Sequence, residues 1–210
     1  MGKEISYFFG REVTGLDSNG RMVFADVNGD GVVNDEDKTD IGSPHPDFTY
    51  GINVSLRYKD FDAQLFFNGS QGNELYNYNK VFTDFGLFFN GNRSTRVLDA
   101  WTPSNTNTDV PALSASYPLE EVSANSYFVE DGSFFRLKNL QVGYTIPNDY
   151  TSKAGLDSVR LYVQGTNLFT ITDYTGFDPE VVAYGNLDLG IDSRLYPISK
   201  VFSLGVNIKF

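Results

Sequence analysis

The clearest feature of the chain is an alternation of apolar and polar residues with a period of two. In FTYGINVSLRY, residues 48–58, every other residue from Phe48 to Tyr58 is apolar, and the residues between them are polar or glycine. Such alternation predicts a β-strand with one apolar and one polar face. After Lys59-Asp60, FDAQLFFNGS (61–70) continues the pattern and breaks it only at Phe66. The two segments together predict a β-hairpin.

Four further segments extend this pattern. LQVGYTI (140–146), VRLYVQGTN (159–167) and VFSLGVNIKF (201–210) alternate in the same way, and ISYFFGREV (5–13) is a weaker sixth strand. No amphipathic helix is equally clear. The expected fold is therefore all-β, with about six antiparallel strands.

The connections alternate strictly between short and long. The links at 59–60 and 147–157 are short, whereas those at 14–47, 71–133 and 169–198 are long. Outer-membrane barrels have short periplasmic turns and long external loops, and strands of about 9 to 12 residues cross a bilayer at a tilt. A soluble antiparallel sandwich explains the alternation equally well but not the asymmetry of the loops. The pattern favours an antiparallel transmembrane β-barrel segment with long extracellular loops.

Composition excludes several classes of function. The chain of 210 residues has no cysteine and one histidine, His45, which lies between two prolines and is a poor candidate for a catalytic base. A net charge of −11 argues against a nucleic-acid surface. The carboxylate pairs Glu130/Asp131 and Asp178/Glu180 are more simply turn and cap residues than a glycosidase pair. Since no acid, base and nucleophile can be nominated, we do not expect an enzyme.

DVNGDGVVNDED, residues 26–37, has the spacing of a calcium-binding loop with glycine at its sixth position. The expected metal ligands are Asp26, Asn28, Asp30, Val32, Asn34 and Asp37. The loop departs from the EF-hand pattern, because position twelve is Asp37 instead of a bidentate glutamate and no helical pattern flanks the loop. We expect structural calcium that braces an external loop; the alternative is a solvated acidic turn.

Two of the long connections are rich in aromatic residues and amides. Flat rings beside amides commonly hold sugars or peptides. The expected ligand or partner contacts are Tyr76, Tyr78, Phe85, Phe88, Tyr174, Phe177 and Tyr184. The alternative is that these rings pack the loops together or seat a partner protein.

Five ordered blocks carry a resemblance to a known family. They are FADVNGDGVVNDEDKTDIGSPHPDFTYGINVSLRYKDFD, DAWTPSNTNTDVP, YFVEDGSFFRLKNLQVGYTIP, LYVQGTNLFTITDYTGFDPEV and YPISKVFSLGVNIKF. Together they resemble the C-terminal part of a SusC/RagA-type TonB-linked outer-membrane protein, a TonB-dependent receptor. The resemblance extends over essentially the whole chain.

The resemblance implies a plugged barrel of about 22 strands in the outer membrane of a Gram-negative, Bacteroidetes-like bacterium. Such a protein imports glycan fragments or peptides, is energised by TonB and works with a SusD-like surface lipoprotein. Residues 1–210 are then a fragment of the barrel without plug or signal peptide, and Phe210 matches the terminal residue read by the barrel-assembly machinery. Arg57, Arg136 and Arg160 are expected to face the lumen and pair with plug carboxylates. The alternative function is a soluble, secreted, calcium-stabilised β-module that binds carbohydrate.

Overall fold

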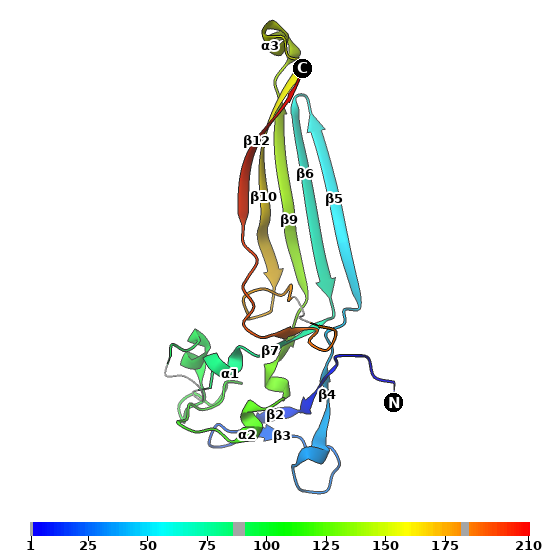
Figure 1. The fold of residues 1–210 in the computed structure, drawn as a ribbon. Coiled ribbons are helices and arrows are strands. Elements are labelled where there is room, and N and C mark those ends of the chain that lie inside the picture. The colour runs from blue at the N-terminus through cyan, green and yellow to red at the C-terminus, as the bar shows by residue number, and fades with distance from the viewer. Residues whose placement is uncertain (1, 86–90, 182–184) are drawn as a thin grey trace. The chain divides into compact units, whose positions relative to one another are not determined.

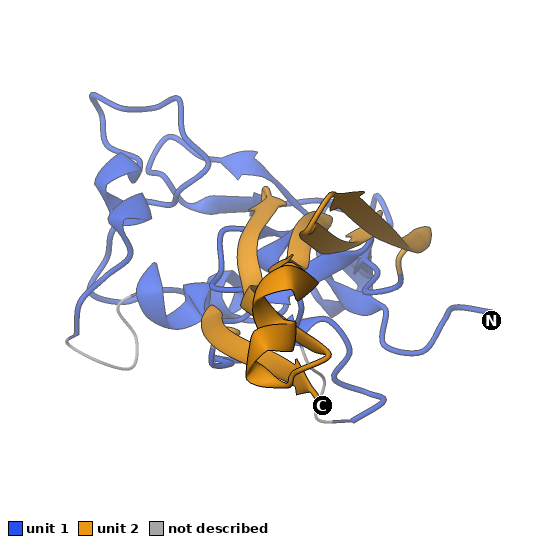
Figure 2. Ribbon diagram, turned by 90° about the horizontal axis from the view of Figure 1, so that it is seen from above, with its two compact units in different colours: residues 1–45, 73–132, 174–196 blue, residues 46–72, 133–173, 197–210 orange. Residues whose placement is uncertain are grey.

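A computed structural model describes residues 2–85, 91–181 and 185–210 of the chain. The chain divides into two compact units, which are treated separately (Figure 2). The strand unit comprises residues 46–72, 133–173 and 197–210. The loop unit comprises residues 1–45, 73–132 and 174–196.

The strand unit is one antiparallel sheet of five long strands, which lie side by side in Figure 1. In sequence order these are β5 (Phe48–Tyr58), β6 (Phe61–Gln71), β9 (Phe134–Thr145), β10 (Ser158–Thr172) and β12 (Val201–Lys209). The order across the sheet is β12-β10-β9-β6-β5, so that the sheet is open at β5 and at β12. A short helix, α3 (Asn148–Thr151), and a 3-10 turn, η4 (Ser152–Ala154), connect β9 to β10.

The register places apolar residues in continuous rows across all five strands. One such row consists of Leu56, Ala63, Val142, Val163 and Leu204. Large apolar side chains on this face are exposed, and Leu204 keeps 85% of its surface. The sheet therefore presents an apolar face that the described residues leave uncovered.

The neighbouring row belongs to the opposite, polar face of the sheet. It consists of Ser55, Gln64, Gln141, Gln164 and Ser203. Because side chains along a strand alternate between faces, the two rows together confirm the amphipathic pattern of the sequence.

The count of six long strands is not confirmed. The segment ISYFFGREV forms β1 (Phe8–Arg11), which has only four residues and belongs to the loop unit. There β1 pairs with β4 (Lys38–Gly42) as a separate two-stranded sheet. The apolar run in this segment is too short to continue the long rows, and Phe8 is buried among loops.

The loop unit is built from short elements. β2 (Val13–Leu16) pairs with β3 (Met22–Phe24), and β7 (Glu74–Asn77) lies between β8 (Val129–Asp131) and β11 (Ile191–Asp192). The helical turns are η1 (Asp35–Asp37), α1 (Lys80–Thr83), η2 (Thr95–Asp99), α2 (Leu119–Val122) and η3 (Ser126–Phe128). Its apolar core consists of Met22, Val81, Phe85 and Phe128. No helix within the described ranges is long and apolar enough to cross a membrane.

Candidate functional site

A buried polar network joins distant segments of the loop unit, with Glu130 at its centre. The carboxylate of Glu130 lies 2.7 Å from Lys80 Nζ and accepts hydrogen bonds from Asn77 Nδ2 and from both the backbone amide and the hydroxyl of Thr175. Burial alone raises the pKa of a carboxyl group, but the Lys80 ammonium and the Thr175 donors hold the pKa of Glu130 below its ordinary value. Glu130 is therefore ionised at neutral pH and paired.

The same network includes a second carboxylate, Asp84. Arg96 Nη1 lies 2.9 Å from Asp84 Oδ2, and the Tyr127 hydroxyl donates to the same oxygen at 2.7 Å. Arg96 also donates to the Thr175 hydroxyl at 2.6 Å. A buried polar network of this kind fixes the relative positions of the segments that it joins.

Two of the predicted ligand-contacting rings are buried instead of exposed. Phe85 is 1% exposed and contacts the rings of Tyr117, Tyr127 and Phe128. Tyr174 is 6% exposed, and its hydroxyl donates to Asp192 Oδ2 at 2.6 Å. Both side chains pack within the loop unit and present little surface in the described conformation, so contact with a ligand stays a prediction for them.

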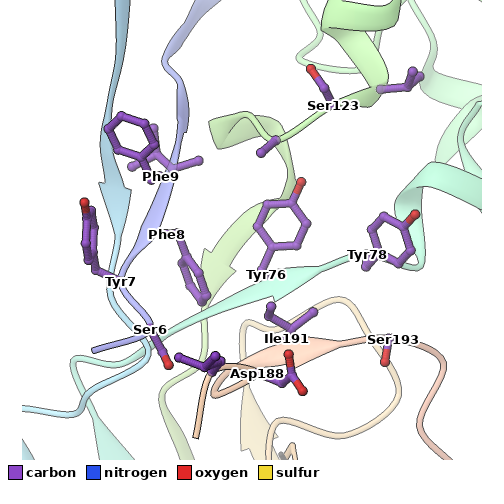
Figure 3. Close-up of a pocket in the computed structure, with 14 residues that line it drawn as sticks. Ser6, Tyr7, Phe8, Phe9, Tyr76, Tyr78, Ser123, Asp188, Ile191 and Ser193 are labelled. Carbon is purple, nitrogen blue, oxygen red and sulfur yellow. The ribbon is translucent and has the colours of Figure 1, made fainter. Parts of the chain in front are cut away.

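Of the other predicted rings, Phe177 is exposed, and Phe88 and Tyr184 lie outside the described residues. Tyr76 and Tyr78 line a cavity of about 660 Å³ in the loop unit (Figure 3). This volume lies within the range of small-ligand pockets. The structure thus brings two of the seven predicted residues together in a cavity.

The cavity lies between β1, β7, residues 122–124 and residues 187–193 (Figure 3). The rings of Phe8 and Tyr76 lie 5.8 Å apart along its wall; Phe9 also comes from β1, and Tyr7 directly precedes this strand. Burial raises the pKa of Tyr76, whose phenol therefore stays neutral.

Polar groups are few in this cavity, and sequence reasoning missed them. Besides the three tyrosines, the polar residues that line it are Ser6, Ser123, Asp188 and Ser193. Sequence analysis missed this wall because SYFF was interpreted as part of a long strand. The signal that was present is the local density of aromatic residues in SYFF.

The acidic loop 26–37 is stabilised by its own backbone. Asp26 accepts hydrogen bonds from the amides of Gly29, Asp30 and Gly31 at 2.8 to 3.2 Å. Gly29 and Gly31 have φ of 75° and 86°, a region that favours glycine.

The second carboxylate that organises this loop is Asp37. It is fully buried and accepts from the amides of Asn34, Val27 and Asn28, and these hydrogen bonds hold its pKa below the ordinary value. In the part of the chain that the structure describes, no three acidic, histidine or cysteine side chains are arranged to hold a metal ion. Calcium binding by this loop stays a prediction.

On the polar face of the strand unit, Arg160 finds its partner within the sheet. Its Nε and Nη2 atoms donate to the two oxygens of Asp62 at 2.9 and 2.5 Å, and Nη2 also donates to Gln141. Arg136 is buried and donates to the hydroxyl of Thr170. For Arg160, a carboxylate partner is thus supplied within the sheet by β6, which lies two strands away on the far side of β9.

Comparison with known proteins gives a consistent set of relatives, although no protein-family model matches the chain. TonB-dependent receptor P3 of Formosa agariphila is 39% identical over the whole chain and 22% of its own length, and TonB-dependent receptor P26 of the same organism is 34% identical over 91% of the chain and 20% of its own length. TonB-dependent receptor SusC of Bacteroides thetaiotaomicron is 33% identical over 92% of the chain and 18% of its own length. The chain spans about a fifth of the length of these relatives.

Solved structures give the same result. The structure of the RagAB peptide transporter matches with a TM-score of 0.77 and 28% identity, over 97% of this chain and 22% of that one. The RagAB peptide importer in its "open-open" state matches with a TM-score of 0.76 over the same shares of both chains.

Proposed function

Because this chain belongs to the TonB-dependent receptors of the SusC/RagA type, which are outer-membrane proteins of Gram-negative Bacteroidetes, we propose that the whole protein imports nutrients across that membrane. TonB supplies the energy for this import in our proposal. The relatives are receptors and transporters, and we propose no catalytic activity for this protein.

The observation that carries the proposal is the amphipathic five-stranded sheet. Its apolar rows run across every strand and are exposed, whereas the opposite face carries amides, hydroxyls and an internal Arg160–Asp62 pair. A wall with lipid on one side and a wet lumen on the other requires this division. The long connections that form the loop unit correspond to the external loops of such a wall.

For the substrate we propose glycan fragments or peptides, and for the partner a SusD-like surface lipoprotein. The support is the similarity to SusC and to the RagAB peptide transporter. Phe210, which follows β12 and is exposed, remains the proposed barrel-assembly signal.

The proposal is tested by uptake in cells. We expect that deletion of the whole receptor gene abolishes uptake of a fluorescently labelled oligosaccharide or peptide, and that loss of TonB has the same effect in cells with the intact gene. Re-introduction of the gene is the control and should restore uptake. Uptake that continues without TonB, or a receptor found outside the outer-membrane fraction, contradicts the proposal.

We also propose that the loop 26–37 binds structural calcium, on the basis of its oxygen-donor spacing. External calcium modules bind with dissociation constants of about 10⁻⁴ to 10⁻³ M. Calorimetric titration of the whole receptor should give an affinity in this range that Asp30→Ala weakens and that Asp149→Ala, on a surface of the strand unit, leaves unchanged. Equal affinities for these two variants would refute the assignment.

A further inference from the structure

The charges of the chain are divided very unequally between its two units. The loop unit has 21 acidic and 8 basic residues, a net charge of −13, whereas the strand unit has 6 acidic and 8 basic residues, a net charge of +2. The net negative charge of the protein is therefore confined to the loop unit. A field of this sign concentrates cations near the loop surface and repels anions.

The aromatic cavity of the loop unit has the same sign. Of the described residues that line it, none is lysine, arginine or histidine, and the single charged one is Asp188. A carboxylate or sulfate group inside this cavity would meet no cation, whereas an ammonium group would meet one carboxylate. The lining of the cavity and the net charge of the loop unit therefore both favour a cation over an anion.

The aromatic walls add a second attraction for a cation. Tyr7, Phe8, Phe9, Tyr76 and Tyr78 line the cavity together with Asp188. Figure 3 shows the rings of Phe8 and Tyr76 beside each other and Asp188 near Ile191, across β7 from the Tyr76 ring. The face of an aromatic ring attracts a nearby cation through its quadrupole. Rings also cover the apolar carbons that carry such a group.

We propose that this cavity binds an imported solute through an ammonium group, held between the aromatic rings and the Asp188 carboxylate. The proposal deepens the proposed function, on which it rests, by giving the chemical class of the solute. The ammonium can belong to an amino sugar or to a lysine side chain of a peptide.

Matched probes separate these sources. The whole receptor in detergent micelles is titrated with hexamers of glucosamine and of N-acetylglucosamine, which carry an amine and an acetamide, respectively, on each of the six sugars. A second pair consists of an N-acetylated pentapeptide with one lysine and its norleucine analogue. We expect the charged member of at least one pair to bind about tenfold more tightly, and the pair concerned identifies the source.

Variants locate the interaction. Asp188→Asn should weaken binding of the charged probe about two- to fivefold and leave its neutral analogue unaffected, because an exposed carboxylate contributes modestly. Tyr7→Leu should weaken the charged probe by a similar factor. Asp109→Asn removes an exposed carboxylate of the same unit that does not line this cavity, and it should have no effect.

The proposal is overturned if neither pair shows a preference for the charged member, or if Asp188→Asn and Asp109→Asn bind the charged probe equally. Because binding is measured in micelles, this result is independent of transport. TonB-dependent uptake without an ammonium preference would refute the present inference alone. An ammonium preference in a receptor that shows no TonB-dependent uptake would refute the proposed function alone.

Discussion

The substitution Leu204→Arg tests whether the apolar face of the strand unit contacts lipid. Leu204 lies on β12 in the row that continues through Val163, Val142, Ala63 and Leu56, and it is 85% exposed. In a bilayer its replacement by arginine places a charge in hydrocarbon. In water the same substitution at so exposed a position would cost little.

The depth of the residue sets the magnitude. β12 has 9 residues, and at about 3.4 Å per residue and a tilt of about 40° it spans about 23 Å, close to the apolar band of about 25 Å. Leu204 adjoins the central Gly205 and so lies within about 3 Å of the midplane, where arginine costs about 2–4 kcal/mol. Ile208 lies about 8 Å from the midplane on the same face, and arginine there should cost roughly 1 kcal/mol.

The assay is reversible folding of the whole receptor into phospholipid vesicles, followed by urea titration. Ser203→Arg is the matched control, because Ser203 lies beside Leu204 on the polar face and should change the free energy of folding by less than about 0.5 kcal/mol. Similar losses for Leu204→Arg and Ser203→Arg would refute the assignment of the two faces. If Ile208→Arg lowers the free energy of unfolding more than Leu204→Arg does, the assumed depth of the two residues in the membrane is refuted.

Two further predictions concern the loop unit. Phe85→Ala should destabilise the loop unit by roughly 3–5 kcal/mol, because it leaves a cavity in the core. The control, Phe177→Ala at a 72% exposed position, should cost less than about 1 kcal/mol. Hydrogen exchange measures both losses of stability, and equal losses would contradict the burial of Phe85. Since the folded-state pKa of Glu130 is lowered, its stabilising contribution is present above pH 4.5 and is lost as pH falls through the folded-state pKa. Glu130→Gln should therefore reduce the loss of stability at acid pH. It should also destabilise the loop unit at pH 7 by about 3–5 kcal/mol, because Lys80 is left buried without its carboxylate partner. An unchanged dependence of hydrogen exchange on pH would contradict this prediction.

The sequence predicts the strand unit well because alternation with a period of two is a local property. The predicted strand boundaries are wrong where the hydrogen-bonded ladder is irregular. The segment 140–146 was expected, but β9 extends from Phe134 to Thr145, and the register shifts between β9 and its neighbours interrupt the alternation near Lys138. β10 likewise continues past the expected end at 167, where Asn167 adopts a φ of 53°. A bulge of this kind inserts residues that hide the period.

The loop unit could be predicted much less well, because its contacts join residues far apart in the chain. The sequence shows that residues 74–89 and 174–184 are rich in aromatic residues, but burial of Phe85 depends on Phe128 and Met22, which are distant in sequence. The cavity wall from β1 was missed for the same reason. Composition identified the correct region of the chain but did not separate core rings from cavity rings.

The partner of Arg160 shows how register creates a contact that no local pattern reveals. Asp62 on β6 pairs with Gly143 on β9, and Gly143 pairs with Tyr162 on β10, so that Arg160 must cross the whole of β9 to reach Asp62. A Cβ at position 143 would lie 2.3 Å from Arg160 Nη2, so glycine leaves the path that the guanidinium takes. The charges of this pair are thereby neutralised within the sheet. The strand unit thus has a net charge of only +2, whereas the loop unit has one of −13, so the electrostatic field of the loop unit is the more negative.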